Sequence, residues 1–269
     1  MDRFALDGRV AVVTGALGKL GPVWCDALLG AGARVLALDL PDAEPSVPFS
    51  ELAKTHGSER LRVARADVLG RASLERALEE ARAAWGVPEI LVNNAGIDQP
   101  AQAAPRTYRM EDVPAAEFMR TMEVNAWGAF QCAQVFGGAM AEAGRGSIVN
   151  IGSLYASVSP DNRLYDHFPN SPPFLKPAAY GASKAALVNL TRYLATHWAA
   201  RGVRVNALSP GGVLGAQDAE FRRKYESRVP MGRMATAADL AGPLVFLASD
   251  AASYVTGIEL VVDGGFTAW

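Results

Sequence analysis

The chain has 269 residues, of which 50% are hydrophobic and 20% are charged, and its formal net charge is −2. This composition is ordinary for a globular protein of one large domain or two small ones, and the charge indicates neither a nucleic-acid nor a membrane partner. Cys25 and Cys132 have no metal-ligand or disulfide spacing, and residues 1–5 show no signal-peptide pattern. We therefore expect a cytoplasmic protein with free thiols.

Short apolar runs alternate with longer segments of helical periodicity along the chain. The predicted order is a strand at 9–14, a helix at 21–31, strands at 34–38 and 61–64, a helix at 72–85, a strand at 89–92, a helical region at 115–141, a strand at 146–151, a helix at 180–199, a strand at 203–208, a helix at 237–248 and a strand at 258–262. Nearly continuous apolar strands separated by helices indicate a parallel sheet covered on both faces. We predict an α/β fold in which residues 1–269 form one domain, a doubly wound parallel sheet of about seven strands flanked by helices.

Two irregular segments, 154–179 and 211–233, interrupt this alternation. Long loops within a compact domain are usually functional. The longest uncharged stretch, between Glu123 and Glu142, contains Asn125 and two glutamines. It therefore predicts a buried helix and no membrane span.

A glycine-rich turn connects the first predicted strand to the first helix, with the sequence Thr14-Gly15-Ala16-Leu17-Gly18-Lys19-Leu20-Gly21. Glycines in this strand–turn–helix context allow a pyrophosphate to approach backbone N–H groups at the helix N-terminus. The pattern predicts a Rossmann-type dinucleotide site. Its expected cofactor-binding residues are Gly15, Leu17, Gly18, Lys19 and Leu20.

Asp39 ends the second predicted strand, 24 residues after Gly15, and Leu40 follows it. An acidic side chain at this distance suits the adenosine ribose hydroxyls and repels a 2′-phosphate, so the sequence favours NAD over NADP. Lys19 is the opposing signal, because a cation near the phosphates tolerates NADP. The alternative interpretation of Asp39 is a simple turn residue at the strand end.

The carboxyl ends of other strands supply the remaining cofactor candidates, because ligands of open α/β sheets bind at that edge. We predict contacts from Asp67 and Val68 after the third strand, from Asn94, Ala95 and Gly96 after the fourth, and from Pro210, Gly211 and Val213 after the sixth. Tyr180 and Lys184, on a later helix, complete the set.

Tyr180 and Lys184 lie four residues apart on a predicted helix, which places both side chains on one face. A free tyrosine has a pKa of about 10, and a nearby ammonium stabilises its phenolate. The pair therefore predicts a general acid/base for an alcohol or a carbonyl. The same spacing arises often by chance, so the pair gains weight only from the motifs around it.

Together these residues resemble the short-chain dehydrogenase/reductase family over essentially the whole chain. The matching motifs are Thr14-Gly15-x-x-Gly18-x-x-Gly21, Asp67, Asn93-Asn94-Ala95-Gly96, Asn125, Ser153, Tyr180-x-x-x-Lys184, Asn206-x-x-Ser209-Pro210-Gly211 and Asp263-Gly264-Gly265. The region from Leu154 to Tyr180 and the C-terminal residues also look similar to oxidoreductases of bacterial sugar modification.

The resemblance implies four catalytic residues, Asn125, Ser153, Tyr180 and Lys184. Tyr180 would exchange a proton with the substrate oxygen, and Ser153 would hydrogen-bond that oxygen. Lys184 would lower the pKa of Tyr180 and bind the nicotinamide ribose, while Asn125 would hold a water molecule that links Lys184 to solvent. The family also implies a homotetramer built through the helices that carry Asn125 and Tyr180.

Two positions depart from the family pattern. Lys19 stands where the family commonly has a glycine, so the conformation of the turn is open at this point. The family often has a threonine after Pro210-Gly211 that contacts the nicotinamide amide, and the corresponding place here lies near Gly215.

The gap of 26 residues between Ser153 and Tyr180 is longer than the one usual in the family. Because both ends of this insertion are predicted catalytic residues, we expect it to line the substrate pocket; an oligomer contact or a surface excursion is the alternative. The predicted substrate contacts are Ser153, Tyr155, Arg163, Tyr180 and Gly212, and Arg163 or Lys176 would bind an anionic group. The segment 211–233 is either a lid over the substrate or a solvated amphipathic helix.

We predict an NAD(P)-dependent oxidoreductase, with NAD favoured, that transfers a hydride between the nicotinamide and a secondary alcohol or carbonyl. The resemblance implies a small-molecule substrate such as a sugar, a sugar acid or a polyol. The alternatives are a nucleotide-sugar epimerase or dehydratase, which the glycine spacing supports and the chain length opposes, and a non-catalytic dinucleotide sensor, which the intact catalytic set opposes. The three histidines have no metal-ligand spacing, so we expect no metal.

Overall fold

The computed structural model describes residues 2–99 and 107–269 of the chain. The sheet in this part of the chain has seven parallel strands in the order β3-β2-β1-β4-β5-β6-β7. The strands are β1 (Val10–Thr14), β2 (Arg34–Asp39), β3 (Leu61–Arg65), β4 (Ile90–Asn93), β5 (Gly146–Ile151), β6 (Val203–Pro210) and β7 (Glu259–Val262). The strand order reverses at the β1–β4 pair, which is the doubly wound topology, so the predicted fold class is confirmed.

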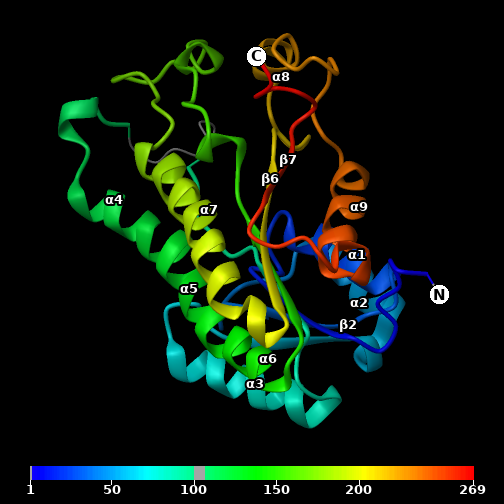
Figure 1. Cartoon of the computed structure of the whole chain (residues 1–269). Coiled ribbons are helices and arrows are strands. Elements are labelled where there is room, and N and C mark those ends of the chain that lie inside the picture. The colour runs from blue at the N-terminus through cyan, green and yellow to red at the C-terminus, as the bar shows by residue number, and fades with distance from the viewer. Residues whose placement is uncertain (1, 100–106) are drawn as a thin grey trace.

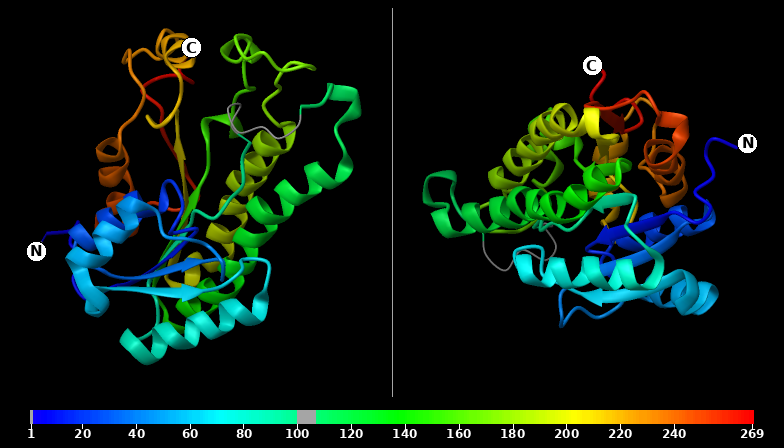
Figure 2. Two further views of the ribbon diagram at one scale, coloured as in Figure 1. Left: turned by 180° about the vertical axis from the view of Figure 1, so that it is seen from behind. Right: turned by 60° about the horizontal axis from the view of Figure 1, so that its bottom comes forward.

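Helices cover both faces of this sheet (Figures 1 and 2). One face packs against α1 (Gly21–Gly30), α2 (Val47–Arg60) and α9 (Ala237–Ala248), and the other against α3 (Arg71–Trp85), α7 (Ala178–Trp198) and the helical region between β4 and β5. Val13 belongs to the first core and its neighbour Val12 to the second. Successive side chains of a strand point to opposite faces, so each buried strand contributes to both cores.

The helical region predicted at 115–141 extends from Ala115 to Ala143 without a break. It consists of α4 (Ala115–Met122), α5 (Ala129–Cys132) and α6 (Gly138–Ala143), joined by two π-helical segments, η3 (Glu123–Gly128) and η4 (Ala133–Gly137). Such wide turns occur frequently at functional sites. The first of them carries Asn125, which is completely buried.

Helix α2 is not among the predicted elements. Its sequence has Pro48 in the first turn and Gly57 near the end, and Gly57 adopts a φ of 63° that interrupts the helical conformation. Phe49 is the one residue of α2 that is fully buried. Because the helix has no apolar stripe, hydrophobic periodicity gave no sign of it.

The two irregular segments, 154–179 and 211–233, lie together above the carboxyl ends of the strands, at the top of Figure 1, and we call them the cap. The cap includes the short turns η5 (Leu154–Ala156) and η6 (Asn162–Leu164), and α8 (Ala219–Glu226). A separate hydrophobic cluster joins its two halves and includes Leu164, Tyr165, Phe174, Phe221, Tyr225 and Val229. Ion pairs of Asp161 with Arg228 and of Asp166 with Lys224 also connect them.

Candidate active site

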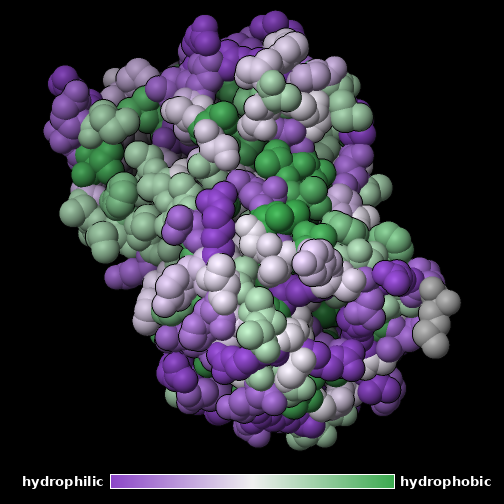
Figure 3. All heavy atoms as spheres, in the orientation of Figure 1, coloured by the Kyte–Doolittle hydropathy of each residue, from purple (hydrophilic) through white to green (hydrophobic). Residues whose placement is uncertain are grey.

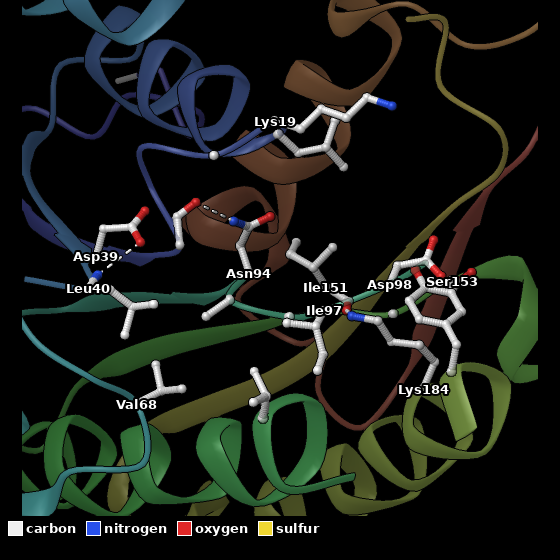
Figure 4. A pocket seen from close by; sticks show the side chains of 18 of the residues that line it. Lys19, Asp39, Leu40, Val68, Asn94, Ile97, Asp98, Ile151, Ser153 and Lys184 are labelled. Atoms are coloured by element: carbon white, nitrogen blue, oxygen red, sulfur yellow. Dashed lines mark hydrogen bonds between the residues drawn. The ribbon is translucent and has the colours of Figure 1, made fainter. Parts of the chain in front are cut away.

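A cleft of about 720 Å³ opens at the carboxyl ends of the strands. Its walls come from the glycine-rich turn, from the residues that follow β2 to β6, and from the start of α7. Figure 4 shows Asp39 and Leu40 at one end of the cleft and Ser153, Asp98 and Lys184 at the other. The predicted adenosine end and the predicted reacting end therefore belong to one continuous cavity.

Tyr180, Lys184 and Ser153 meet at the second end of this cleft. Helix α7 begins at Ala178, so Tyr180 lies in its first turn and Lys184 one turn later on the same face. Ser153 lies two residues after the end of β5, at the start of η5, and a side-chain hydrogen bond joins it to the Tyr180 phenol. The fold thus brings a hydroxyl, a phenol and an ammonium to one place.

The Lys184 ammonium is buried and donates a hydrogen bond to the carbonyl oxygen of Ile151 at 2.7 Å. Burial lowers the pKa of Lys184 to about 8, and the charge of Asp98 acts in the opposite direction. The ammonium lies 5.8 Å from the centroid of the Tyr180 ring. A cation is therefore next to the phenol, as the helical spacing predicts.

The pKa of Tyr180 nevertheless differs from the expectation that Lys184 would lower it. Burial is the main cause that raises the pKa of Tyr180, the charge of Asp98 raises it further, and the hydrogen bond with Ser153 acts in the opposite direction. Desolvation of the phenolate is the largest contribution to this shift. Contrary to the expectation, the polypeptide by itself raises the pKa of Tyr180 and favours the protonated phenol.

Asn125 is not among the residues that line the cleft. Its Nδ2 donates to the Ile97 carbonyl oxygen and to Ser183 Oγ, each at 3.0 Å, and its Oδ1 accepts from the Ile97 backbone N–H at 2.7 Å. A Cβ added to Gly96 would lie 3.1 Å from Asn125 Oδ1 and 3.7 Å from Lys184 Nζ. Asn125 therefore clamps the chain that follows β4 close to the Lys184 ammonium.

The glycine-rich turn fits a pyrophosphate. Gly15 has a φ of 62°, and a Cβ there would lie 2.8 Å from the Ala95 Cα, so only glycine fits this close crossing. Gly18 also lines the cleft. Within the described part of the chain, no side chain caps the N-terminus of α1, and its first turn carries no acidic residue. These N–H groups are suited to an anion at the helix N-terminus.

Asp39 and Lys19 lie in different parts of the cleft (Figure 4). Asp39 Oδ2 accepts a hydrogen bond from the Leu17 backbone N–H at 2.8 Å, and Oδ1 accepts one from Leu40 at 2.9 Å. The Lys19 side chain extends towards the cap, where a Cβ on Gly215 would lie 3.2 Å from its Nζ. The predicted adenosine end of the cleft is therefore next to the carboxylate and not next to this ammonium.

Most residues predicted to bind the cofactor do line the cleft, namely Gly15, Gly18, Lys19, Leu20, Asp39, Leu40, Asp67, Val68, Asn94, Ala95, Gly96, Tyr180, Lys184, Pro210, Gly211 and Val213. Leu17 does not, because its side chain is buried in the core beneath the turn. Of the predicted substrate contacts, Ser153 and Tyr180 line the cleft, whereas Tyr155, Arg163 and Gly212 do not.

These three residues take part in the cap instead. The Arg163 guanidinium pairs with Asp161 at 2.6 Å and its side chain is 80% exposed. The Tyr155 hydroxyl lies 3.4 Å from that of Tyr165, and the Gly212 backbone N–H donates to the Tyr225 hydroxyl. The basic residue of the insertion that reaches the catalytic end is Lys176, whose Nζ lies 5.1 Å from the centroid of the Tyr180 ring.

Sequence reasoning missed several residues of the cleft wall, including Ile97, Asp98, Arg120, Ile151 and Gly152. Asp98 is the most consequential, because its charge acts on both Tyr180 and Lys184. The available signal was its position two residues after Gly96, at the sheet edge where ligands bind.

Comparisons with known proteins agree with this geometry. A family model described as enoyl-(acyl carrier protein) reductase matches residues 19–267. Galactitol 2-dehydrogenase (L-tagatose-forming) of Cereibacter sphaeroides is 38% identical over 99% of this chain and 98% of its own, and D-threitol dehydrogenase of Mycolicibacterium smegmatis is 36% identical over 98% and 95%. The chain belongs to the short-chain dehydrogenase/reductase family.

A solved structure supports the same assignment. Gluconate 5-dehydrogenase of Burkholderia cenocepacia J2315, in complex with NADP and tartrate, matches this short-chain dehydrogenase/reductase with a TM-score of 0.83 and 32% identity, over 100% of this chain and 98% of the other. The protein is an NAD(P)-dependent oxidoreductase that acts on CH–OH groups. The epimerase, dehydratase and sensor alternatives are not favoured by these relatives.

Two further features of the described residues bear on other functions. Among residues 2–99 and 107–269, no helix combines the length and the apolar character needed to cross a bilayer. In the same residues, no group of three or more His, Cys, Asp or Glu side chains is arranged to hold a metal ion.

Proposed function

We propose that this enzyme is an NAD-dependent polyol dehydrogenase, which oxidises a secondary alcohol of a small sugar alcohol and reduces the corresponding ketone. The observation that carries the proposal is the meeting of the Tyr180 phenol, the Ser153 hydroxyl and the Lys184 ammonium at one end of a cleft that has Asp39 at its other end. The names of the galactitol and threitol dehydrogenases support a polyol as substrate.

In the oxidation direction, Tyr180 Oη takes the hydroxyl proton of the substrate while the carbon–oxygen bond becomes a carbonyl. Ser153 Oγ donates a hydrogen bond to the same oxygen and stabilises the charge on it. When bound, the oxidised dinucleotide supplies the hydride acceptor and a positive charge near the phenol. The cap, residues 154–179 and 211–233, provides the substrate loops and excludes water from this end of the cleft.

Lys184 has two roles in this proposal. Its ammonium, fixed by the Ile151 carbonyl, binds the nicotinamide ribose and stabilises the phenolate that Tyr180 needs during alcohol oxidation. Lys184 Nζ and Asn125 Oδ1 both approach Gly96, which supports a water-mediated connection between them for the return of the proton. Asn125 also fixes the backbone of Ile97, next to Gly96, through two hydrogen bonds.

The preference for NAD over NADP rests on Asp39. Asp39 is the last residue of β2, and its carboxylate lines the cleft beside Leu40. There it accepts hydrogen bonds from the ribose hydroxyls and repels a 2′-phosphate. Lys19 extends towards Gly215 and so does not offset this repulsion. Replacement of Asp39 by alanine is expected to reduce the ratio of kcat/KM for NAD to that for NADP, and an unchanged ratio contradicts the assignment.

Self-association as a cytoplasmic homotetramer is part of the same proposal. Large apolar side chains are exposed along α4, η3 and α7, including Met119, Trp127 and Tyr193. Figure 3 shows hydrophobic residues gathered on the side of the molecule where α4 and α7 lie in Figure 1. Exposed apolar patches of this kind mark protein interfaces. Light scattering of the purified protein distinguishes a tetramer from a monomer.

The substrate class is tested by initial rates of dinucleotide reduction with a panel of neutral polyols, aldonates and simple secondary alcohols, each with NAD and with NADP. The proposal predicts the highest kcat/KM for a neutral polyol with NAD. A preference for aldonates or for monohydric alcohols contradicts the polyol assignment and leaves the oxidoreductase class intact.

A further inference from the structure

Asp98 lies in the wall between two cavities. A second cavity of about 580 Å³ is lined by residues of α4 and of the segment that leads into α7. It shares Ile97, Asp98, Arg120 and Tyr180 with the cofactor cleft. Asp98 and Tyr180 are therefore both reached from either cavity.

Lys176 holds the Asp98 carboxylate in place at this wall. Its ammonium donates to Asp98 Oδ2 at 2.5 Å, and the Lys176 side chain is 9% exposed, whereas that of Asp98 is 35% exposed. Asp98 Oδ1 accepts a hydrogen bond from the Gln99 backbone N–H at 2.8 Å. Figure 4 shows Asp98 at the same end of the cleft as Ser153. The pair thus presents an acceptor and a donor beside the phenol.

We propose that the Asp98–Lys176 pair binds the hydroxyl group on the carbon next to the reacting one, and so selects vicinal diols and polyols over monohydric alcohols. This inference deepens the proposed function and rests on it. A hydroxyl group both donates and accepts, which matches a carboxylate and an ammonium side by side. Each Asp98 oxygen has one protein partner among these contacts and retains a lone pair for a substrate hydroxyl.

The charge of the pair favours neutral substrates. The Lys176 ammonium is neutralised by Asp98, so a substrate carboxylate entering here gains no net attraction from the pair. Arg120 lines both cavities on an exposed part of α4 and is the group to which an aldonate would bind if anions were the true substrates. The neutral and the anionic alternatives therefore depend on different side chains.

Three four-carbon alcohols test the inference, because threitol, butane-2,3-diol and butan-2-ol differ in hydroxyl number on the same carbon chain. For Asp98→Ala, we expect the ratio of kcat/KM for butane-2,3-diol to that for butan-2-ol to fall about 10- to 100-fold, the range of one hydrogen bond to a charged group. The same ratio should fall less for Asp98→Asn, because the amide oxygen still accepts a hydrogen bond from the substrate hydroxyl. Lys176→Met should lower the ratio in the same direction, and Lys176→Arg should restore part of it.

Arg82→Met is the matched control, since it removes a cation from the ion pair with Glu79 on α3, outside both cavities and the cap. It should keep the wild-type ratio, and thermal melting should show that all variants are folded. If the Asp98→Ala and Lys176→Met enzymes are folded and keep the wild-type ratio of diol to monohydric alcohol, the inference is wrong. The proposed function still holds in that case, provided that the wild type oxidises polyols. A wild-type preference for gluconate over threitol that is lost in Arg120→Ala contradicts both.

Discussion

The Lys184 ammonium donates a hydrogen bond to the Ile151 carbonyl oxygen at 2.7 Å and thereby fixes α7 against the end of β5. Because Lys184 is buried, this bond determines where the positive charge stands relative to Tyr180. We expect Lys184→Met to reduce kcat at least ~10²-fold, since it removes a charge that stabilises the phenolate and a contact to the ribose. Steady-state kinetics and dinucleotide binding measure both effects, and a wild-type kcat in the folded variant contradicts this role.

The pH dependence of the reaction follows from the Tyr180 phenol. Burial raises the pKa of Tyr180, so the protonated form persists above neutral pH. Alcohol oxidation uses the deprotonated phenol, and carbonyl reduction uses the protonated one. We therefore expect kcat/KM for oxidation to rise with pH up to and beyond about pH 10, the ordinary pKa of tyrosine, and kcat/KM for reduction to stay constant until that pH is approached. An oxidation rate that falls over this range is incompatible with Tyr180 as the base.

The buried Asn125 amide is expected to support both stability and catalysis. Asn125→Ala leaves the Ile97 backbone groups without their partner, which should cost about 1–3 kcal/mol of unfolding free energy. Because Ile97 lies between Gly96 and Asp98 in the cleft wall, kcat should fall as well. Chemical denaturation and steady-state kinetics measure the two effects.

Asn206 provides a matched control for this prediction. Its Nδ2 donates to the Val255 carbonyl oxygen at 2.9 Å and its Oδ1 accepts from the Ile258 N–H at 3.2 Å, so it clamps backbone in the same way but outside the cleft. Asn206→Ala should lower stability by a similar amount and retain kcat. Equal losses of kcat in both variants would show that Asn125 acts through stability alone.

The cap is expected to close over the substrate. Phe221 packs against Tyr165 with ring centroids 5.5 Å apart and so joins α8 to the insertion. Phe221→Ala should raise KM for the polyol with a small change in Tm, because it loosens the cap and not the main core. Phe136→Ala, in the core under the sheet, should instead cost about 3–5 kcal/mol of stability. An unchanged KM in Phe221→Ala argues against a cap that covers the substrate.

Much of the fold could be predicted from the sequence because buried parallel strands are continuous apolar runs. The strand at 146–151 and the helix at 237–248 have the same bounds in the structure. Helix α2 was missed, since its polar composition, Pro48 and Gly57 hide its periodicity. The two π-helical segments of the long helical region were also not predictable, because hydrophobic periodicity does not separate such a turn from the α-helix around it.

The candidate site was predictable where a motif fixes the backbone and not where side chains approach from loops. The glycine-rich turn and the Tyr180–Lys184 pair, chosen from separate motifs, both line one cleft. Arg163 was chosen for its charge, but Asp161 two residues earlier pairs with it in the cap. Asp98 and Lys176 meet across 78 residues of sequence, and no local pattern indicates such a contact.

The central claim is that the Tyr180 hydroxyl exchanges the proton of the substrate alcohol. Its most direct test is the initial rate of NADH formation from a polyol by the wild type and by Tyr180→Phe, with dinucleotide binding and Tm measured in parallel. We predict that kcat falls by about 10²- to 10⁴-fold while the variant stays folded and binds NAD. A Tyr180→Phe enzyme that oxidises the polyol at the wild-type rate contradicts the account.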